Sequence, residues 1–306
     1  MRVRILQWGG DRDEPDVERT ASHRTSRMWW PISPESIARV PKGDPVDTVM
    51  SDKGRMYRNA GRSDVAELQV SMEKRARHAL GSHEPKPLKY KDVPKAVESA
   101  RDAFENDPFF HYLSDTPDRN KARFEKQRKD ISTILTLYAF IRSRHALTVN
   151  SGEAMAFYRL APNDTPVSSP LNRMLDAIAK RTQKALGIFQ SPEQRKRNAE
   201  AIAKRDAILK KLFGDEISDM AELAGLATAP AAQGRGYGTA LVREVTTIAD
   251  AYGRSTWLVS SNVNNTGFYE SVGFRVVGEF ALGENNPTWG KAPVIIRIMV
   301  RPYSTH

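Results

Sequence analysis

A glycine-rich turn constrains the fold of this chain more than any other feature of its sequence. Gly234, Gly236 and Gly238 occupy alternate positions, between an uncharged run over 223–230 and apolar residues at helical spacing over 241–252. The run is typical of a buried strand and the spacing of an amphipathic helix. At such a strand-to-helix turn, free backbone N–H groups and the positive end of the helix dipole point at one spot. The turn therefore predicts a pyrophosphate-binding site.

The spacing of the glycines narrows the choice of ligand. A P-loop needs Lys followed by Ser or Thr after its last glycine, and the dinucleotide fingerprint spaces its glycines differently. This chain instead carries Q-x-x-G-x-G as Gln233, Gly236 and Gly238. With the segments that follow, this pattern resembles the acetyl-CoA-binding signature of the GNAT acetyltransferase superfamily.

Two more segments carry the same resemblance, in the order that the family has them. Asn265, Phe268, Tyr269 and the Gly-Phe pair that ends at Phe274 resemble an N-x-x-F-Y-E-x-x-G-F segment, in which a short helix leads into the next strand. Residues 100–109 resemble the first helix and loop of the puromycin N-acetyltransferase-like branch, with fungal members closest. The likeness covers roughly residues 87–303.

The composition excludes several chemistries. The chain has no Cys, so it has neither disulfides nor an enzyme thiolate, and acetyl-CoA would be attacked directly by the acceptor. Its 6 His residues are scattered without metal-ligand spacing, so no metal site is predicted. We find no apolar run that could span a bilayer and no signal-peptide pattern at the start. A cytoplasmic protein without a membrane partner is expected.

The net charge of +10 is concentrated between about residues 86 and 220. Much of it lies on one expected helix, in the clusters 195–197, 204–205 and 210–211. A solvated helix face is the favoured interpretation of these clusters. The alternatives are a surface for nucleic acid or an acidic protein, and a patch near the phosphorylated end of CoA. Because no aromatic residues interleave with the charges, no nucleic-acid partner is predicted.

The chain divides into two parts. Residues 1–85 are expected to form a poorly ordered N-terminal extension, with at most a short helix over 64–80. Residues 86–306 are expected to be a GNAT acetyltransferase domain with an inserted helical pair at about 166–214 that covers the acceptor pocket. Other expected elements are helices starting near Asp92 and spanning 121–144, a hairpin of strands 146–149 and 154–160, a strand over 255–259, and last strands over 275–280 and 294–300.

The fold class expected from this order is mixed α/β (α+β). The resemblance implies the GNAT acyl-CoA acyltransferase fold, a mostly antiparallel central sheet flanked by helices, here with a two-helix insertion. It also implies that two central parallel strands splay apart and admit the pantetheine arm of the cofactor.

The resemblance assigns cofactor-binding residues one by one. On the strand before the turn, backbone groups of Leu226, Ala227 and Thr228 would meet the pantetheine and the thioester oxygen. Asn265 would bond the pantetheine, or else only cap the next helix. The residues that would bind the pyrophosphate, mostly through N–H groups, are Gln233, Gly234, Arg235, Gly236, Tyr237, Gly238 and Thr239.

The catalytic candidates are a general acid and a general base. Tyr269 matches the family position whose phenol meets the sulfur of the cofactor and protonates the leaving thiolate, so the resemblance makes it both cofactor-binding and catalytic. The alternative is a plain aromatic core residue. Glu222 lies 233 − 222 = 11 residues before Gln233, where some protein-acetylating members carry a base carboxylate. The alternative is a solvated Glu at a strand end, and the puromycin-acetylating branch has an apolar residue there. Asp219 and His111 are weaker candidates, and water suffices if the amine arrives neutral.

The function that follows is an acetyl-CoA-dependent N-acetyltransferase acting on a primary amine of a small molecule, without a covalent enzyme intermediate. Acceptor specificity is expected from the loop at 109–112, the strand at 157–158, the inserted helices and the loop at 284–289. One alternative is a protein or peptide acetyltransferase for lysine or N-terminal amines. Others are a non-catalytic acyl-CoA-binding module and a basic nucleic-acid-associated protein. A monomer or a homodimer is expected.

Overall fold

The computed structural model describes residues 83–165 and 168–304. The predicted N-terminal extension lies almost entirely outside these residues, as does the expected short helix over 64–80. None of the helices in the described part is both long enough and apolar enough to cross a membrane.

Seven strands of the described chain form one sheet in the order β1-β2-β3-β4-β5-β7-β6. Neighbouring strands are antiparallel except for β4 and β5, which are parallel. The predicted mixed, mostly antiparallel α/β sheet is therefore confirmed. The strands are β1 (Lys86–Pro87), β2 (Ala146–Val149), β3 (Ala154–Arg159), β4 (Ala221–Thr228), β5 (Thr256–Ser260), β6 (Arg275–Leu282) and β7 (Val294–Arg301).

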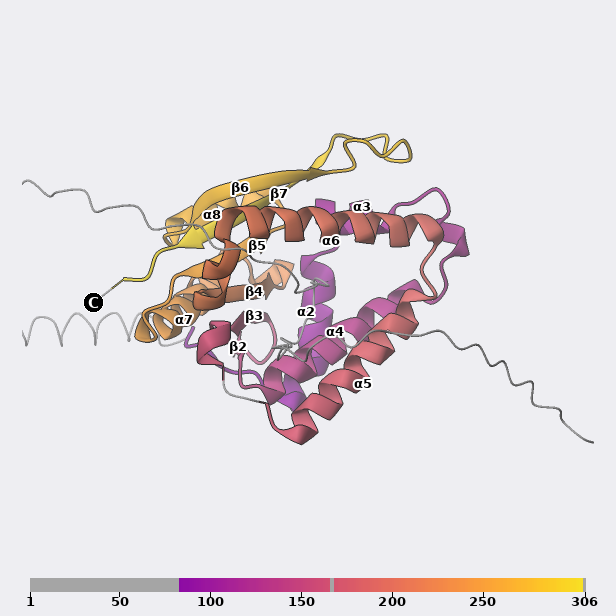
Figure 1. The fold of residues 1–306 in the computed structure, drawn as a ribbon. Coiled ribbons are helices and arrows are strands. Elements are labelled where there is room, and N and C mark those ends of the chain that lie inside the picture. Colours follow the sequence, from indigo (N-terminus) through magenta and orange to yellow (C-terminus); the bar gives the residue numbers. More distant parts are fainter. Residues whose placement is uncertain (1–82, 166–167, 305–306) are drawn as a thin grey trace, which may run out of the picture.

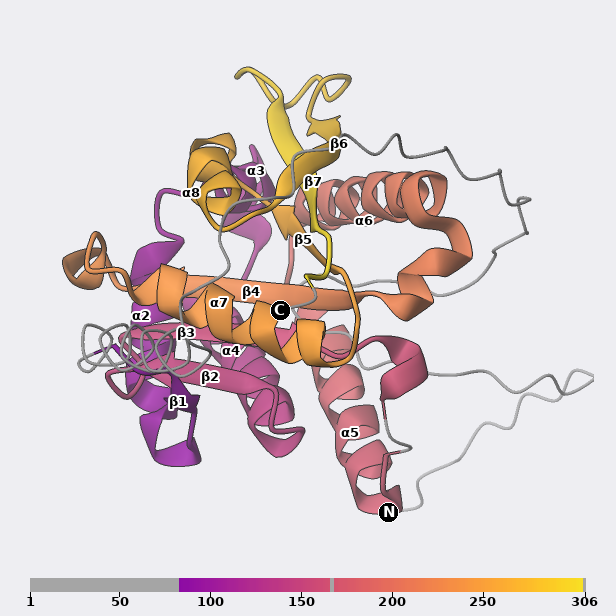
Figure 2. The same cartoon turned by 90° about the vertical axis from the view of Figure 1, so that its left-hand side faces the viewer.

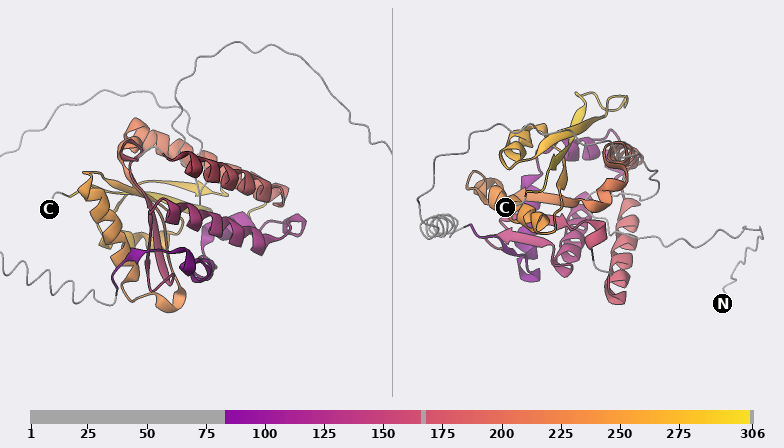
Figure 3. Two further views of the ribbon diagram at one scale, coloured as in Figure 1. Left: turned by 90° about the horizontal axis from the view of Figure 1, so that it is seen from below. Right: turned by 60° about the vertical axis from the view of Figure 1, so that its left-hand side comes forward.

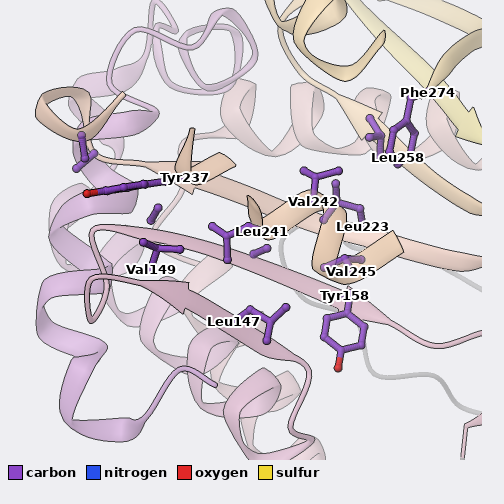
Figure 4. Packing of buried hydrophobic residues seen from close by; sticks show 14 of the residues in the cluster. Leu147, Val149, Tyr158, Leu223, Tyr237, Leu241, Val242, Val245, Leu258 and Phe274 are labelled. Carbon is purple, nitrogen blue, oxygen red and sulfur yellow. The ribbon is translucent and has the colours of Figure 1, made fainter. Parts of the chain in front are cut away.

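Helices cover both faces of this sheet (Figures 1 and 2). They are α2 (Val93–Ala103), α3 (Pro108–Ser114), α4 (Glu125–Arg142), α5 (Pro170–Gly187), α6 (Pro192–Phe213), α7 (Tyr237–Ala251) and α8 (Thr266–Ser271). The alternation of β3 separates the faces, because successive side chains of a strand point to opposite sides. Met155 and Phe157 pack under α2 and α4, whereas Ala156 and Tyr158 pack under α7. Figure 4 shows the α7 side, where Leu241 and its neighbours close the core.

The two central parallel strands separate after a short contact. β4 and β5 pair only through Ala221 with Thr256 and Glu222 with Trp257. Beyond these pairs β4 stays bonded to β3 and β5 stays bonded to β7. A register shift opposite Phe157 and Tyr158 bulges β4, which bends a strand away from its neighbour. The splay that the resemblance implied is therefore present, and the edge of β4 faces the gap.

The helical pair α5 and α6 leaves the sheet after β3 and returns before β4 (Figures 1 and 3). Ser191 caps α6 through the predicted capping box, since its hydroxyl accepts from the Gln194 N–H and Gln194 accepts from the Ser191 N–H. α5 packs along α4, and α6 packs on β6 and α3. Contact with β6 is close, because a Cβ on Gly278 would come within 2.8 Å of Leu212. The pair thus joins the two halves of the splayed sheet.

The cationic clusters of α6 are not all solvated. Arg195, Lys196, Lys210 and Lys211 are exposed as expected. Arg197 and Arg205 are only 0% and 1% exposed, so the interpretation as a solvated face is wrong for these two. A guanidinium has donors enough to bind several buried carbonyls and carboxylates, which makes its burial tolerable.

Candidate active site

The glycine turn lies between the end of β4 and the start of α7, as predicted. Gly234 and Gly236 have φ of +75° and +80°, a region that favours glycine. Apart from each glycine and its chain neighbours, no heavy atom of the described residues lies within 4 Å of a Cβ built on either glycine, so the turn is open on that side. Gly236 is the N-cap of α7, and the first N–H groups of the helix have no partner within it. The turn is therefore suited to bind an anion at the positive end of the helix.

The side chains of the turn have mixed roles. Gln233 donates from Nε2 to the Thr228 carbonyl at 3.2 Å, which ties the turn to the end of β4. The Tyr237 side chain is buried, accepts a hydrogen bond from Asn150 at 2.8 Å and meets the His83 ring at 4.9 Å. Arg235 is exposed and Thr239 half-buried. Of these side chains, Arg235 is the one best placed to add charge to the cradle.

Gly238 allows α8 to lie close to α7. A Cβ there would come within 3.3 Å of the Phe268 ring. Phe268 in turn packs edge-on against Tyr269, with 5.1 Å between ring centroids. The third glycine thus lets the helix that carries Tyr269 lie close to the cofactor turn.

Tyr269 is held in the protonated state. Burial, with a smaller contribution from the charge of Asp107, raises the pKa of Tyr269 to about 12. Because the phenol binds its proton up to that pH, it remains a proton donor throughout the neutral range. A general acid requires this state.

Asp107 is a buried carboxylate that sequence reasoning did not single out. It is 6% exposed and caps α3, with Oδ1 accepting from the N–H of Phe109 at 2.9 Å and of Phe110 at 3.4 Å. The Ser261 hydroxyl donates to its Oδ2 at 2.6 Å. Burial raises the pKa of Asp107 and outweighs the hydrogen bonds that lower it. The Asp-Pro pair signals a cap in the sequence, but nothing there reveals the burial or the contact with Ser261.

Glu222 lies at the closed end of the gap. It pairs with Trp257 of β5 on one side, and on the other side Arg159 donates to its carboxylate at 2.5 Å. The Arg159 guanidinium also lies over the Phe140 ring at 5.0 Å. A carboxylate in such an ion pair is less available as a base than a free one, and its role stays a prediction.

The weaker base candidates are also engaged. Asp219 accepts from Asn163 and from Arg254, each at 2.9 Å. His111 contacts Asp115 at 3.1 Å on the surface of α3.

The remaining predicted cofactor residues lie along the gap. Leu226, Ala227 and Thr228 belong to β4 beyond its last pair with β5, and they bond to β3 on the other side. Asn265 is exposed at the N-cap position of α8 and makes no side-chain cap hydrogen bond. The residues assigned to the cofactor thus come from β4 beyond its pairs with β5, from the glycine turn and from α8.

Most of the aromatic residues expected to select the acceptor belong to the core. Phe109, Tyr112, Phe157 and Tyr158 are all buried. Phe110 is half-buried and meets the rings of Phe104 at 5.1 Å and Phe109 at 5.4 Å. Phe110 lies three residues after Asp107 in the chain, so this carboxylate has an aromatic side chain close to it in sequence.

No group of three or more His, Asp or Glu residues in the described ranges could hold a metal ion.

Comparison with known proteins agrees with this geometry. A family model described as Acetyltransferase (GNAT) domain matches residues 198–276, which contain β4, the glycine turn, α7, β5 and α8. The match to this part of the chain supports the predicted class of enzyme, an acyltransferase. No curated protein matches the sequence.

Several solved structures are similar in part. Arylalkylamine N-acetyltransferase 2 from Aedes aegypti has 14% identity and a TM-score of 0.46, covering 72% of this chain and 99% of that one. The C-terminal condensation domain of Ebony in complex with beta-alanyl-dopamine has 11% identity and a TM-score of 0.48, covering 71% and 97%. A histone acetyltransferase HPA2-related protein from Corynebacterium glutamicum has 16% identity and a TM-score of 0.40, covering 74% and 98%. Likenesses of this size carry no argument about the acceptor.

Proposed function

We propose that the chain is an acetyl-CoA-dependent N-acetyltransferase that transfers acetyl directly to a primary amine of a small molecule. The observation that carries the proposal is the joint position of the β4–β5 gap, the open turn of α7 and the protonated Tyr269. Gly234 and Gly236 leave room for a pyrophosphate, and the unpaired edge of β4 offers backbone groups to an extended pantetheine. These residues fit the cofactor that the resemblance implies.

In the proposed reaction the amine nitrogen attacks the thioester carbonyl carbon and the C–S bond then breaks. Backbone N–H groups of β4 stabilise the oxyanion while it exists. Tyr269 gives its proton to the leaving thiolate and regains one from solvent. The nitrogen loses one proton to a base, so protons balance over the cycle.

Asp107 is our first candidate for that base. Its raised pKa, and the effect of its charge on Tyr269, suit a group that receives the one proton that the neutral amine loses when it attacks the thioester. The neighbouring Phe110 favours an acceptor with an apolar or aromatic body. Glu222 remains the second candidate, with Arg159 as its partner.

Two other functions remain alternatives. A protein or peptide acetyltransferase needs an open groove for a lysine or an N-terminal amine, and a non-catalytic module binds acyl-CoA without turnover. We keep as parts of the proposal a cytoplasmic location, a monomeric or homodimeric state and the kinship to fungal puromycin N-acetyltransferase-like proteins. No nucleic-acid, membrane or metal partner is proposed.

The test combines binding and turnover. Acetyl-CoA is titrated into the protein by calorimetry, and release of free thiol is followed with 2-phenylethylamine, spermidine and a lysine peptide. Binding together with turnover of a small amine supports the proposal. Turnover of the peptide alone favours a protein acetyltransferase. Binding of acetyl-CoA without any turnover favours a non-catalytic acyl-CoA-binding module. If acetyl-CoA does not bind, the proposal of an acetyltransferase is rejected.

Asp107→Asn is expected to lower kcat/KM by about 100-fold or more, because the amide cannot take up a proton. The thermal midpoint should stay the same or rise. A carboxyl whose folded pKa is raised costs stability when it ionises, and that cost begins as the pH rises through its unfolded value. Asn keeps the N-cap and has no charge to bury. The acid limb of the pH–rate profile should vanish with the carboxyl.

Asp102→Asn is the control, since Asp102 is an exposed carboxylate on α2 and has no hydrogen bond or ion pair with α3 in the described part of the chain. It should leave kcat/KM unchanged. Turnover of Asp107→Asn at the wild-type rate would show that the base is another group.

A further inference from the structure

Arg197 is the most buried charge of the inserted pair, with a fully enclosed side chain. We propose that helix α6, through Arg197, is the element that positions the acceptor side of the site. This inference rests on the proposed function. It makes Arg197 a positioning residue, which acts through α3 and the loop between β6 and β7.

All three nitrogens of the guanidinium are engaged. Nη1 donates to the carbonyls of Tyr112 at 2.7 Å and Asp115 at 3.1 Å. Nη2 donates to the carbonyl and the hydroxyl of Thr288, both at 2.9 Å. Nε donates to Glu193 at 3.0 Å, one turn earlier on α6. One cation thus joins α6 to two segments that are far from it in the sequence.

Aromatic rings enclose the same cation. The Arg197 carbon Cζ lies 4.9 Å from the centroid of Tyr112 and 5.3 Å from that of Trp289. The two rings meet edge-on at 5.1 Å. Cation–π contacts of a desolvated guanidinium add to its hydrogen bonds and fix its plane.

A second set of contacts from α6 holds the same two segments. Glu200 accepts from the Tyr112 hydroxyl at 2.5 Å and from the Gly283 N–H at 3.2 Å. Glu193 accepts from Asn286 at 2.8 Å and from Thr288 at 2.5 Å. Burial alone would raise the pKa of Glu193 and of Glu200, but hydrogen bonds lower both, those to Glu193 including one from Arg197. Both carboxylates are therefore charged at neutral pH and complement the cations of α6.

The link to the site runs through α3. This helix of 7 residues begins after Asp107 and ends at Ser114, so Arg197 holds its last turn while Asp107 caps its first. A helix this short moves as one body. Displacing its C-terminal end therefore displaces Asp107 and Phe110. Misplacement of reacting groups by about 1 Å can cost about 100-fold in rate.

The cofactor side is not part of this network. The contacts of Arg197 reach α3, the 286–289 loop and α6, whereas the glycine turn belongs to β4 and α7. Loss of Arg197 should therefore separate acceptor binding from acetyl-CoA binding. A general loss of folding would affect both.

The test compares Arg197→Met and Arg197→Lys with Arg195→Met, an exposed arginine on the same helix. With the best amine of the panel above, Arg197→Met should lower kcat/KM for the amine by about 10- to 100-fold, because Asp107 and Phe110 are both displaced. The KM and the calorimetric Kd for acetyl-CoA should stay within about twofold of wild type. Arg197→Lys should restore part of the loss, since an ammonium retains the charge but not the planar fork. Arg195→Met should behave as wild type.

Hydrogen exchange provides a readout that needs no acceptor. In Arg197→Met, amides of 107–115 and 283–289 should exchange faster, while those of 237–251 keep their protection. If Arg197→Met does not fold, Arg197→Lys and Thr288→Val take its place. We expect the same segments to exchange faster in these two variants, by a smaller amount.

The inference is overturned if acetyl-CoA affinity falls in parallel with kcat/KM for the amine, or if kcat/KM for the amine does not change. A wild-type protein that binds acetyl-CoA but acetylates no amine contradicts the proposed function instead. In that case hydrogen exchange decides alone, and unchanged exchange over 107–115 refutes the role of Arg197.

Discussion

Gly236→Asp is expected to weaken acetyl-CoA binding by about 100-fold or more, through charge repulsion and competition for the N–H groups that would bind pyrophosphate. The new carboxylate would lie at the N-cap of α7, where its negative charge is next to the free amides of the first turn. It would thus occupy the cradle from within. Calorimetric titration of acetyl-CoA measures the effect.

The fold should survive this change. A residue with a Cβ in the left-handed region costs about 1–2 kcal/mol. Asp is among the side chains that tolerate this region best. Apart from residue 236 and its chain neighbours, no heavy atom of the described residues lies within 4 Å of the new Cβ. Thermal unfolding should therefore change far less than the affinity.

Two alanine variants separate strain from charge. Gly253 has a φ of +66° just beyond the other end of α7 and has similarly open surroundings. Gly236→Ala and Gly253→Ala should destabilise the protein by similar amounts, with acetyl-CoA affinity nearly unchanged in the second. Normal binding by Gly236→Asp would show that the turn is only structural.

The elements around the cofactor turn could be predicted because their signals are local. Gly234 and Gly236 have positive φ for reasons visible in the sequence, and the hairpin between β2 and β3 turns at 150–152 as predicted. The exact ends of helices depend on backbone conformations that the sequence does not reveal. The helix expected over 121–144 begins at Glu125, because Phe124 has a φ of 53° and the chain before it forms a short 3-10 turn. The sequence around Phe124 is equally compatible with an extended or a helical backbone at this residue.

The role of α6 could not be predicted, because this helix docks largely through polar side chains. Its apolar periodicity is poor, and charged residues at helical spacing favour a solvated face. Arg197 binds carbonyls 82 to 91 residues away, and only the fold brings these to it. Glu193 and Glu200 likewise bind partners that are far from them in the sequence. Burial of such residues depends on partners that a single sequence does not reveal.

The base candidates illustrate the same limit. Spacing from Gln233 singled out Glu222, yet its partner Arg159 depends on the register of β3 with β4 and on the bulge between them. Asp107 showed only its capping role, since Ser261 lies 154 residues further along the chain. Local patterns located the glycine turn and Tyr269, whereas tertiary contacts decide the surroundings of Glu222 and Asp107.

Tyr269→Phe is expected to reduce kcat by about 100- to 10,000-fold, because the leaving thiolate would lose its proton donor. The Kd for acetyl-CoA should barely change, since the ring and its contacts with Phe268 and Phe274 remain. Steady-state thiol release and calorimetry measure the two quantities. Tyr252→Phe is the matched control, because this exposed tyrosine lies at the far end of α7.

The pH dependence separates a proton donor from a core residue. With its pKa raised to about 12, the phenol does not titrate in the neutral range, so the ratio of wild-type to variant kcat should be constant there. The phenol's contribution is lost only as the pH approaches that value. A core residue with a satisfied hydroxyl predicts the opposite pattern, a lower thermal midpoint with kcat retained. Wild-type kcat in Tyr269→Phe would mean that solvent protonates the thiolate, and the acid of this site would then be water.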